Sequence, residues 1–304
     1  MVRYNMDYLL SSIKPRNHII VDLLATKYQN IIDIKGRDIR LFANAISQSV
    51  YHQIKGLVVN SKYTLKDADF LWKQINETKR SDHYIREHYN IYWTDDDCNF
   101  FDRMYKLIST KIHNEYIKSF LISAMIETML HQSIYGRFNT STEGYLGEKE
   151  NLTKDEFLFI IADLKNKIRS GAEVTVLNLD VLSFIKTIST AGIIYYEIPT
   201  RNLFYDYHPI YDICENYNTG HFIENRLHLS EEIRNKAESY IYRGDKFIKH
   251  WAAMLPIIME IDFEHLVFKL NNKLDVEKEW LQEKLSKYGP TELLKPNYLA
   301  LAKK

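Results

Sequence analysis

The chain has 304 residues, of which 45% are hydrophobic and 13% aromatic, so it is long enough to bury a large core. Lys and Arg together number 40, as do Asp and Glu, and the resulting net charge of zero excludes a global field that would recruit nucleic acid or an acidic membrane. A local basic cleft remains possible. The two cysteines, Cys98 and Cys214, have no metal-ligand spacing, the N-terminus has no apolar signal core, and no apolar run is long enough to span a membrane, so we expect a reduced, cytoplasmic setting.

Strand and helix signals alternate over residues 1–60. Residues 18–25 (HIIVDLLA) and 38–45 (DIRLFANA) have the apolar content of buried strands, and residues 31–34 predict a short helix between them. Residues 46–59 carry apolar side chains at helical spacing and predict a longer helix. Because the order is strand, helix, strand, helix, it predicts a parallel sheet.

Residues 61–170 break this alternation and predict an all-helical insertion. Thr94 is placed to cap one helix, and residues 116–138 form a long and very apolar one. Thr153 and Glu156 have the spacing of a capping box, which predicts the start of another helix.

Strand signals return after residue 170, and two further helices lie among them. The strands are expected at residues 173–180, 192–199, 254–262, 266–270 and 298–304, and the helices at residues 230–242 and 275–288. The chain is therefore predicted to have an α/β fold. A mostly parallel seven-stranded sheet would be formed by residues 1–60 and 171–304, with the helical insertion at residues 61–170.

Several short motifs occur in an order that resembles one protein family. Residues 22–30 read DLLATKYQN where that family has a Gly-rich D-L-F-A-G-[ST]-G loop, and residues 42–60 read FANAISQSVYHQIKGLVVN where it has a strand ending in Asn-Asp and then a helix. The other matches are YWTDDDC (92–98), SIYGRF (133–138), LNLD (177–180), EIPT (197–200), the pair Tyr207-His208 and NYLALAKK (297–304). With this order and spacing, the sequence resembles the Dam-like class of adenine-specific DNA methyltransferases over nearly its whole length.

The resemblance implies a Rossmann-like, S-adenosylmethionine-dependent methyltransferase fold and gives positions to the site residues. Glu197 and Pro199 fall in the family's Asp-Pro-Pro-Tyr motif, whose acid accepts protons of the adenine amine and whose last ring stacks on the flipped base. Asp22, Asn44 and Asp180 fall at cofactor-binding positions. From the residues alone, Asp180 could instead cap the following helix, and Glu197 could be kept for packing or a hydrogen bond at a strand end.

Both motifs depart from the family's pattern. Glu197 carries its carboxylate one methylene further out, Ile198 replaces a proline, and Thr200 cannot stack on a base. The loop DLLATKYQN has no glycine, so Thr26 and Lys27 would put side chains where backbone should approach the cofactor. We therefore expect the isolated chain to bind no cofactor, and the catalytic position to be inactive.

Basic and aromatic residues near the end of EIPT, and later in the stretch 236–249, are candidate DNA contacts. Rings can stack on bases of any sequence, and cations can contact phosphates. The candidates are Arg201, Tyr205, Tyr207, His208, Lys246 and Lys249. The alternative is that the rings belong to the core or to contacts with the helical insertion, and that the lysines lie on a solvated amphipathic face.

These features together predict a catalytically degenerate DNA adenine methyltransferase homologue. It would act as a DNA-binding or structural subunit of an active methyltransferase, or of a restriction-modification or phage-defence complex. Its expected partners are DNA and the active subunit, with no metal and no membrane. Two alternatives stay open: an active but divergent site-specific adenine methyltransferase that uses S-adenosylmethionine, and a protein-interaction module that binds no DNA.

Overall fold

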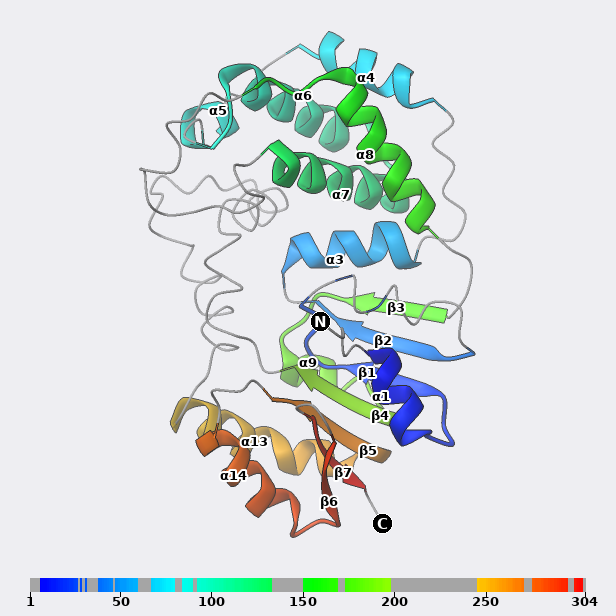
Figure 1. Cartoon of the computed structure of the whole chain (residues 1–304), viewed down its shortest axis with the longest axis vertical. Coiled ribbons are helices and arrows are strands. Elements are labelled where there is room, and N and C mark those ends of the chain that lie inside the picture. The colour runs from blue at the N-terminus through cyan, green and yellow to red at the C-terminus, as the bar shows by residue number, and fades with distance from the viewer. Residues whose placement is uncertain are drawn as a thin grey trace. The chain divides into compact units, whose positions relative to one another are not determined.

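The computed structural model describes residues 6–26, 28, 31, 38–45, 47–59, 67–79, 84–89, 92–132, 150–168, 173–197, 245–270, 275–294 and 298–302 (Figure 1). The chain divides into two compact units. The sheet unit comprises Met1–Tyr51, Ser170–Arg201 and Glu231–Lys304, and the helical unit comprises His52–Arg169 and Asn202–Ser230. Of residues 61–170, where the sequence predicts the helical insertion, all but Ser170 belong to the helical unit, which also includes residues 52–60 and 202–230.

The sheet unit is built on one seven-stranded sheet, as the sequence predicts. Its strands are β1 (Ile19–Asp22), β2 (Arg40–Asn44), β3 (Glu173–Leu177), β4 (Thr190–Glu197), β5 (Asp262–Lys269), β6 (Thr291–Leu294) and β7 (Tyr298–Ala302). Their order is β3-β2-β1-β4-β5-β7-β6. Neighbours from β3 to β5 pair in parallel, and β7 is antiparallel to both β5 and β6. The fold is therefore α/β with a mostly parallel sheet.

Register places the carboxyl ends of the parallel strands at one edge of the sheet. Asp22 of β1 lies opposite Tyr195 of β4. Glu197, which ends β4, lies opposite Lys269, which ends β5. In open α/β sheets, ligands bind outside this edge, so these residues define where a site is to be sought.

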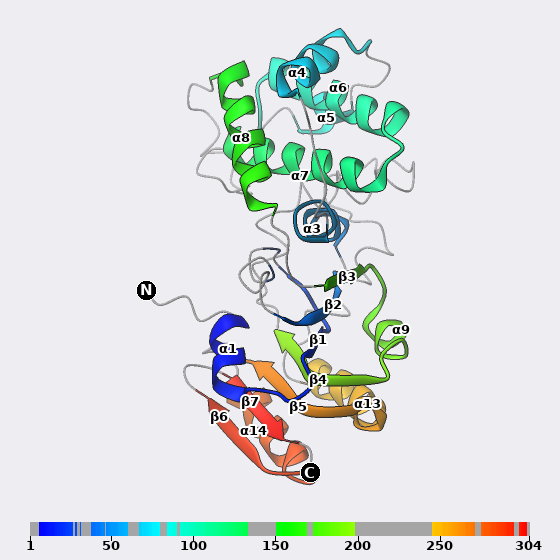
Figure 2. The same ribbon diagram turned by 90° about the vertical axis from the view of Figure 1, so that its right-hand side faces the viewer.

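Alternating side chains bury both faces of the sheet. Ile194, Leu266 and Phe268 point into a core that also contains residues of α9 (Val181–Ile185), α13 (Asp245–Glu260) and α14 (Asp275–Leu285). Figure 2 shows α1 (Met6–Ile13) on the opposite face of the sheet from α9 and α13. Helices on both faces explain why β4 reads as an unbroken apolar run rather than an alternating one.

One expected strand is wrong. Residues 254–262 lie mostly in α13, and β5 begins only at Asp262. Trp251, Met254 and Ile258 recur at helical spacing and are fully buried, so packing on the sheet selects the helix. Pro256 stands on the exposed side of α13. The seventh strand is instead β6, a short edge strand that the sequence analysis did not anticipate.

The helical unit contains only helices and their connections among its described residues. After α3 (Gln48–Ile54), which the unit boundary crosses, come the π-helical turn η1 (Lys55–Val59), α4 (Ala68–Glu77), α5 (Tyr84–Tyr89), α6 (Asp95–Lys111), α7 (Glu115–Gln132) and α8 (Lys154–Lys167). Two predicted starts are confirmed. Thr94 caps α6, and Thr153 and Glu156 form the capping box of α8.

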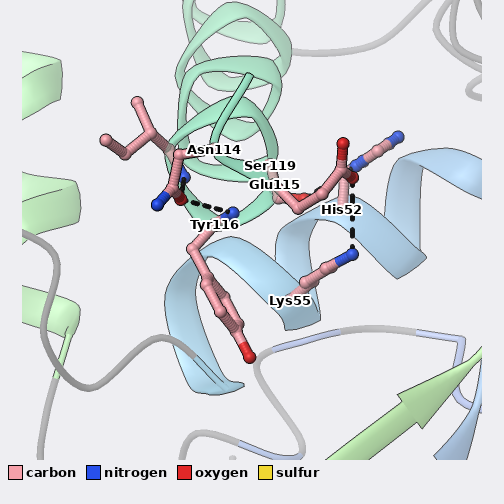
Figure 3. A network of polar contacts seen from close by, with 7 residues as sticks. His52, Lys55, Asn114, Glu115, Tyr116 and Ser119 are labelled. Carbon is pink, nitrogen blue, oxygen red and sulfur yellow. Dashed lines mark hydrogen bonds and ion pairs between the residues drawn. The ribbon is translucent and has the colours of Figure 1, made fainter. Parts of the chain in front are cut away.

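Close packing joins η1 to α7 in the helical unit. A side chain at Gly56 would place its Cβ 2.5 Å from the amide nitrogen of Phe120, so only glycine fits there. Beside this contact, His52 and Ser119 share a buried hydrogen bond of 3.0 Å between Nδ1 and Oγ (Figure 3). No helix in the described part of the chain is both long enough and apolar enough to cross a membrane.

Candidate functional site

A charged cluster lies where β4 and β5 end. The Nζ atom of Lys269 is 2.9 Å from Oε1 of Glu197, and both side chains are largely buried, with exposed fractions of 29% and 19%. The phenol of Tyr195 donates to the other carboxylate oxygen of Glu197 at 3.4 Å. Both oxygens of Glu197 therefore have donors from the sheet itself.

Asp22 brings a second carboxyl group to the same strand ends. Its side chain is 3% exposed, and its Oδ1 accepts a hydrogen bond of 3.1 Å from the amide of Leu24. Burial raises the pKa of Asp22 to about 7, against the lowering effects of the Leu24 amide and of Lys269, while the charge of Glu197 raises it further. Near neutral pH, Asp22 therefore carries a proton for part of the time.

Tyr195 stays a neutral donor within this cluster. Burial raises its pKa well above 10, and the negative charges of Glu197 and Asp22 add to that effect. A phenol that keeps its proton can donate to Glu197. The cluster thus fixes the carboxyl group of Glu197 between Lys269 and Tyr195.

The loop after β1 uses its own backbone donors. The amide of Leu23 donates to the carbonyl of Tyr195 at 2.9 Å, and the amide of Ala25 donates to the carbonyl of Asn44 at 2.8 Å. With the Leu24–Asp22 bond, three successive amides are thus occupied. None of these three remains for the carboxylate or the hydroxyls of a ligand.

Side chains fill the same loop where the resembled family has glycines. Tyr28 is at the last glycine position of that motif and is 2% exposed. Thr26 is at the first glycine position, and its buried Oγ1 has no hydrogen-bond partner among the described residues. Because a threonine and a buried tyrosine occupy the positions where the backbone would have to approach S-adenosylmethionine, the described part of this loop does not fit that cofactor.

Asn44 braces three chain segments instead of facing a ligand. Its Oδ1 accepts from the Leu179 amide at 3.0 Å, and its Nδ2 donates to the Leu179 carbonyl at 2.9 Å. A longer bond of 3.4 Å joins Nδ2 to the carbonyl of Leu23. The side chain is fully buried, so its amide group is committed to the scaffold.

Asp180 is the N-cap of α9. Its Oδ1 accepts from the amide of Ser183 at 2.9 Å, and hydrogen bonds from Ser183 lower the pKa of Asp180. This geometry is the helix-cap alternative that the sequence left open. Asp22 and Glu197 therefore meet in one charged cluster, whereas Asn44 and Asp180 flank Leu179 in structural roles.

For the remaining predicted site residues, the structure describes no contact at this edge of the sheet. Lys249 is exposed on α13, and Lys246 lies in the same helix, but its side chain is outside the described part. Five further predictions fall outside the described residues: Pro199, Arg201, Tyr205, Tyr207 and His208.

Lys269 and Tyr195 are the residues that the sequence analysis missed. Tyr195 stands two positions before Glu197 on β4, which places both on one face of a strand, so that signal was present. Lys269 is 72 residues away from Glu197, and only the register between β4 and β5 brings them together. Within the described residues, no group of three or more His, Cys, Asp or Glu side chains could hold a metal ion.

In comparisons with known proteins, no protein-family model matches the chain and no curated protein matches it significantly. A function for the chain therefore has to rest on its fold and on the geometry of the strand ends.

Proposed function

We propose that the chain is a catalytically degenerate homologue of DNA adenine methyltransferases that acts as a DNA-binding or structural subunit. Its partner would be an active methyltransferase, or a restriction-modification or phage-defence complex that contains one. The α/β unit then corresponds to the S-adenosylmethionine-dependent methyltransferase fold, and the helical unit to its target-recognition insertion.

The strand order supports the fold assignment in this proposal. A doubly wound sheet has the order 3-2-1-4-5-6. The sheet unit has β3-β2-β1-β4-β5 in that order and then inserts the reversed β7 before β6, so it is compatible with a Rossmann-like fold. Because one fold can host many functions, the proposed function has to be argued from the site residues and not from the fold.

The loop after β1 is the observation that carries the proposal of degeneracy. Tyr28 is buried at the last glycine position of the family's cofactor motif, and the amides of Leu23, Leu24 and Ala25 all bond within the protein. A loop whose amides are satisfied by its own groups has few donors left for a ligand, and a buried tyrosine stands where the motif needs a glycine. Loss of cofactor binding follows from this packing.

The environment of Glu197 supports loss of the methyl-transfer step. In the resembled family, the strand-end acid accepts protons from the adenine amine. Here Lys269 and Tyr195 already donate to the two oxygens of Glu197. An amine would have to compete with an ammonium group held at 2.9 Å, so Glu197 is better suited to holding the strand ends than to orienting a base.

Calorimetric titration and co-purification together test the proposal. We expect S-adenosylmethionine to bind the isolated chain with a Kd of about 1 mM or weaker. A tagged chain purified from its native host is expected to bring a methyltransferase with it, and the pair is expected to bind duplex DNA. Micromolar binding of the cofactor by the isolated chain would contradict degeneracy. Absence of DNA binding by the chain, both alone and with whatever it brings down, would contradict the DNA-binding role, and absence of a co-purifying methyltransferase would contradict the subunit role.

A further inference from the structure

Helix α6 of the helical unit contacts both α4 and α5 (Figure 1). On one side, the carboxylate of Asp102 accepts from the amides of Ile85 and Arg86 in α5, at 2.9 and 3.3 Å. On the other side, Nη1 of Arg103 donates to Oδ1 of Asn76 in α4 at 3.4 Å. The guanidinium group of Arg103 is therefore held where α6 meets α4.

Three polar residues share one face of α6. Asn99, Arg103 and Lys106 stand at positions i, i+4 and i+7, which a helix turns to the same side. Asn99 is 8% exposed, and Arg103 and Lys106 are half-buried. This face therefore combines a buried carboxamide with two partly buried cations.

Two of these side chains have buried polar atoms without partners. Oδ1 of Asn99 and Nε of Arg103 are both shielded from water, and neither has a hydrogen-bond partner among the described residues. No acid in the described part of the chain pairs with Arg103. An unsatisfied buried polar atom costs free energy and is rare in folded proteins, so two on one helix face indicate that a polar group binds beside them.

Arg103 differs in this respect from other cations of the unit. The guanidinium group of Arg86 pairs with Asp95 at 2.8 Å. Exposed lysines such as Lys79 keep their ammonium groups in water and need no partner from the protein. What sets Arg103 apart is a donor that is both buried and unbonded.

We infer that Asn99, Arg103 and Lys106 form a binding site for a phosphate group. The inference goes beyond the proposed function, because the site would take the phosphate of a free nucleotide as well as that of DNA. Asn76 occupies Nη1 of Arg103, and the opposite edge of the guanidinium group, formed by Nε and Nη2, has no described partner. Two parallel N–H groups on such an edge match two oxygens of a phosphate.

The other two residues favour a phosphate over a carboxylate. No described hydrogen bond fixes the carboxamide of Asn99, so a half-turn about its last bond presents Nδ2, a donor, in place of Oδ1. Lys106 adds a second positive charge on the same face. A phosphate has oxygens in several directions that can accept from all three side chains, whereas a carboxylate has two oxygens in one plane.

NMR of the arginine Nε–H groups in the full chain tests this inference. Arg103→Lys identifies the Arg103 signal by its loss, and it keeps the positive charge while removing Nε. Inorganic phosphate, thymidine monophosphate and a short DNA duplex are titrated separately, with chloride and acetate at equal ionic strength as controls. Arg86→Lys is the matched variant, because Arg86 is already paired with Asp95.

We expect the Arg103 signal to shift with phosphate and not with chloride or acetate. In titration calorimetry, Arg103→Lys should weaken phosphate binding by about tenfold or more, because hydrogen bonds between charged groups are strong, and Arg86→Lys should change it by less than about twofold. Asn99→Leu removes the unsatisfied amide without leaving a hole. It should weaken phosphate binding and raise the melting temperature, which decides the question even if Arg103→Lys does not fold.

The source of the phosphate is read from which probe shifts the Arg103 signal. A shift with the duplex identifies the DNA backbone, and a shift with phosphate and the nucleotide alone identifies a free phosphate compound. If the nucleotide shifts the signal but the chain binds no duplex, alone or with its partner, the inference stands and the proposed DNA-binding role fails.

Three outcomes would overturn the inference. If none of the three probes shifts the Arg103 signal, the site does not bind phosphate, and duplex binding seen by fluorescence anisotropy would leave the proposed function standing. An equal shift with acetate would mean that the site does not select phosphate. Unchanged phosphate affinity in Arg103→Lys would mean that charge alone attracts the anion.

Discussion

The two units of the chain bury ionisable side chains of opposite kinds. In the sheet unit, burial raises the pKa of Asp22 to about 7, and in the helical unit, burial lowers the pKa of His52 to about 3. Both shifts favour the neutral form, because removal from water penalises a charge of either sign. Lys118 and Lys55 lower the pKa of His52 further. The sheet unit should therefore weaken as the pH rises, and the helical unit as it falls.

The units also differ in how far their polar side chains are already bonded within the protein. At the strand ends of the sheet unit, carboxylate oxygens and loop amides are bonded to the protein's own groups. In the helical unit, the described Lys106, Lys111 and Lys118 make no ion pair with any residue that the structure describes. The difference supports our proposal that Glu197 holds the strand ends of the sheet unit together.

The largest expected effect concerns His52. Its folded pKa of about 3 lies below its ordinary value of 6.5, so the unfolded chain binds the proton more readily, and stability is lost as the pH falls from about 6.5 to about 3. The full loss amounts to at most about 5 kcal/mol, from 1.36 kcal/mol per pKa unit. His52→Gln should remove most of this acid sensitivity.

Urea unfolding at several pH values measures this effect. Trp72 and Trp93 lie in the helical unit, and Trp251 and Trp280 in the sheet unit, so replacing one pair with Phe lets fluorescence report on the other unit. His113→Gln, at an exposed histidine of the same unit, is the matched control and should leave the acid sensitivity in place. An unchanged pH profile in His52→Gln would contradict the interpretation.

Asp22 should give a slightly smaller effect of opposite sign. Its folded pKa of about 7 lies above the ordinary 3.8, so its stabilising contribution is complete below about pH 4 and is lost as the pH rises to about 7. The difference corresponds to about 4 kcal/mol. Asp22→Asn keeps an oxygen for the Leu24 amide and cannot ionise, so the variant should be more stable than the parent at pH 8.

The same urea series, read from Trp251 and Trp280, checks this prediction. Asp180→Asn is a useful control, because Asp180 is a mainly exposed cap whose pKa is lowered rather than raised. That variant should lose a little stability at pH 8 instead of gaining it. Equal stability of the parent and Asp22→Asn at pH 8 would mean that Asp22 is ionised in the folded protein without cost.

Local signals in the sequence predicted part of this comparison and could not predict the rest. The capping box at Thr153 and Glu156, and the helix-cap alternative for Asp180, depend on residues three apart and were readable from spacing. The apolar run at residues 254–262 was ambiguous, because a short buried helix and a buried strand have the same composition. The pairing of Lys269 with Glu197 depends on strand register across 72 residues, which no local pattern contains.

A smaller effect is expected from breaking the Lys269–Glu197 pair. Lys269→Met leaves Glu197 largely buried without its cation and beside Asp22, and should destabilise the sheet unit by about 1–3 kcal/mol, less than a fully buried pair would. The double variant Lys269→Met/Glu197→Gln should recover part of that loss. Additive losses in the double variant would show that the two side chains do not depend on one another.

The smallest effect is expected on catalysis by the complex. If Glu197 is a structural partner of Lys269, then Glu197→Gln should change the turnover of a co-purified methyltransferase by less than about threefold, whereas loss of an essential proton-transfer group costs about 100-fold or more. Turnover is measured by methyl transfer to a duplex substrate, at a temperature where the melting curves of both forms show full folding. The Lys269→Met variant serves as the comparison, because it disturbs the same strand ends without touching the carboxylate. A 100-fold loss of turnover in Glu197→Gln but not in Lys269→Met would mean that Glu197 is a catalytic residue. The strand ends of the sheet unit would then be part of the active site of the complex.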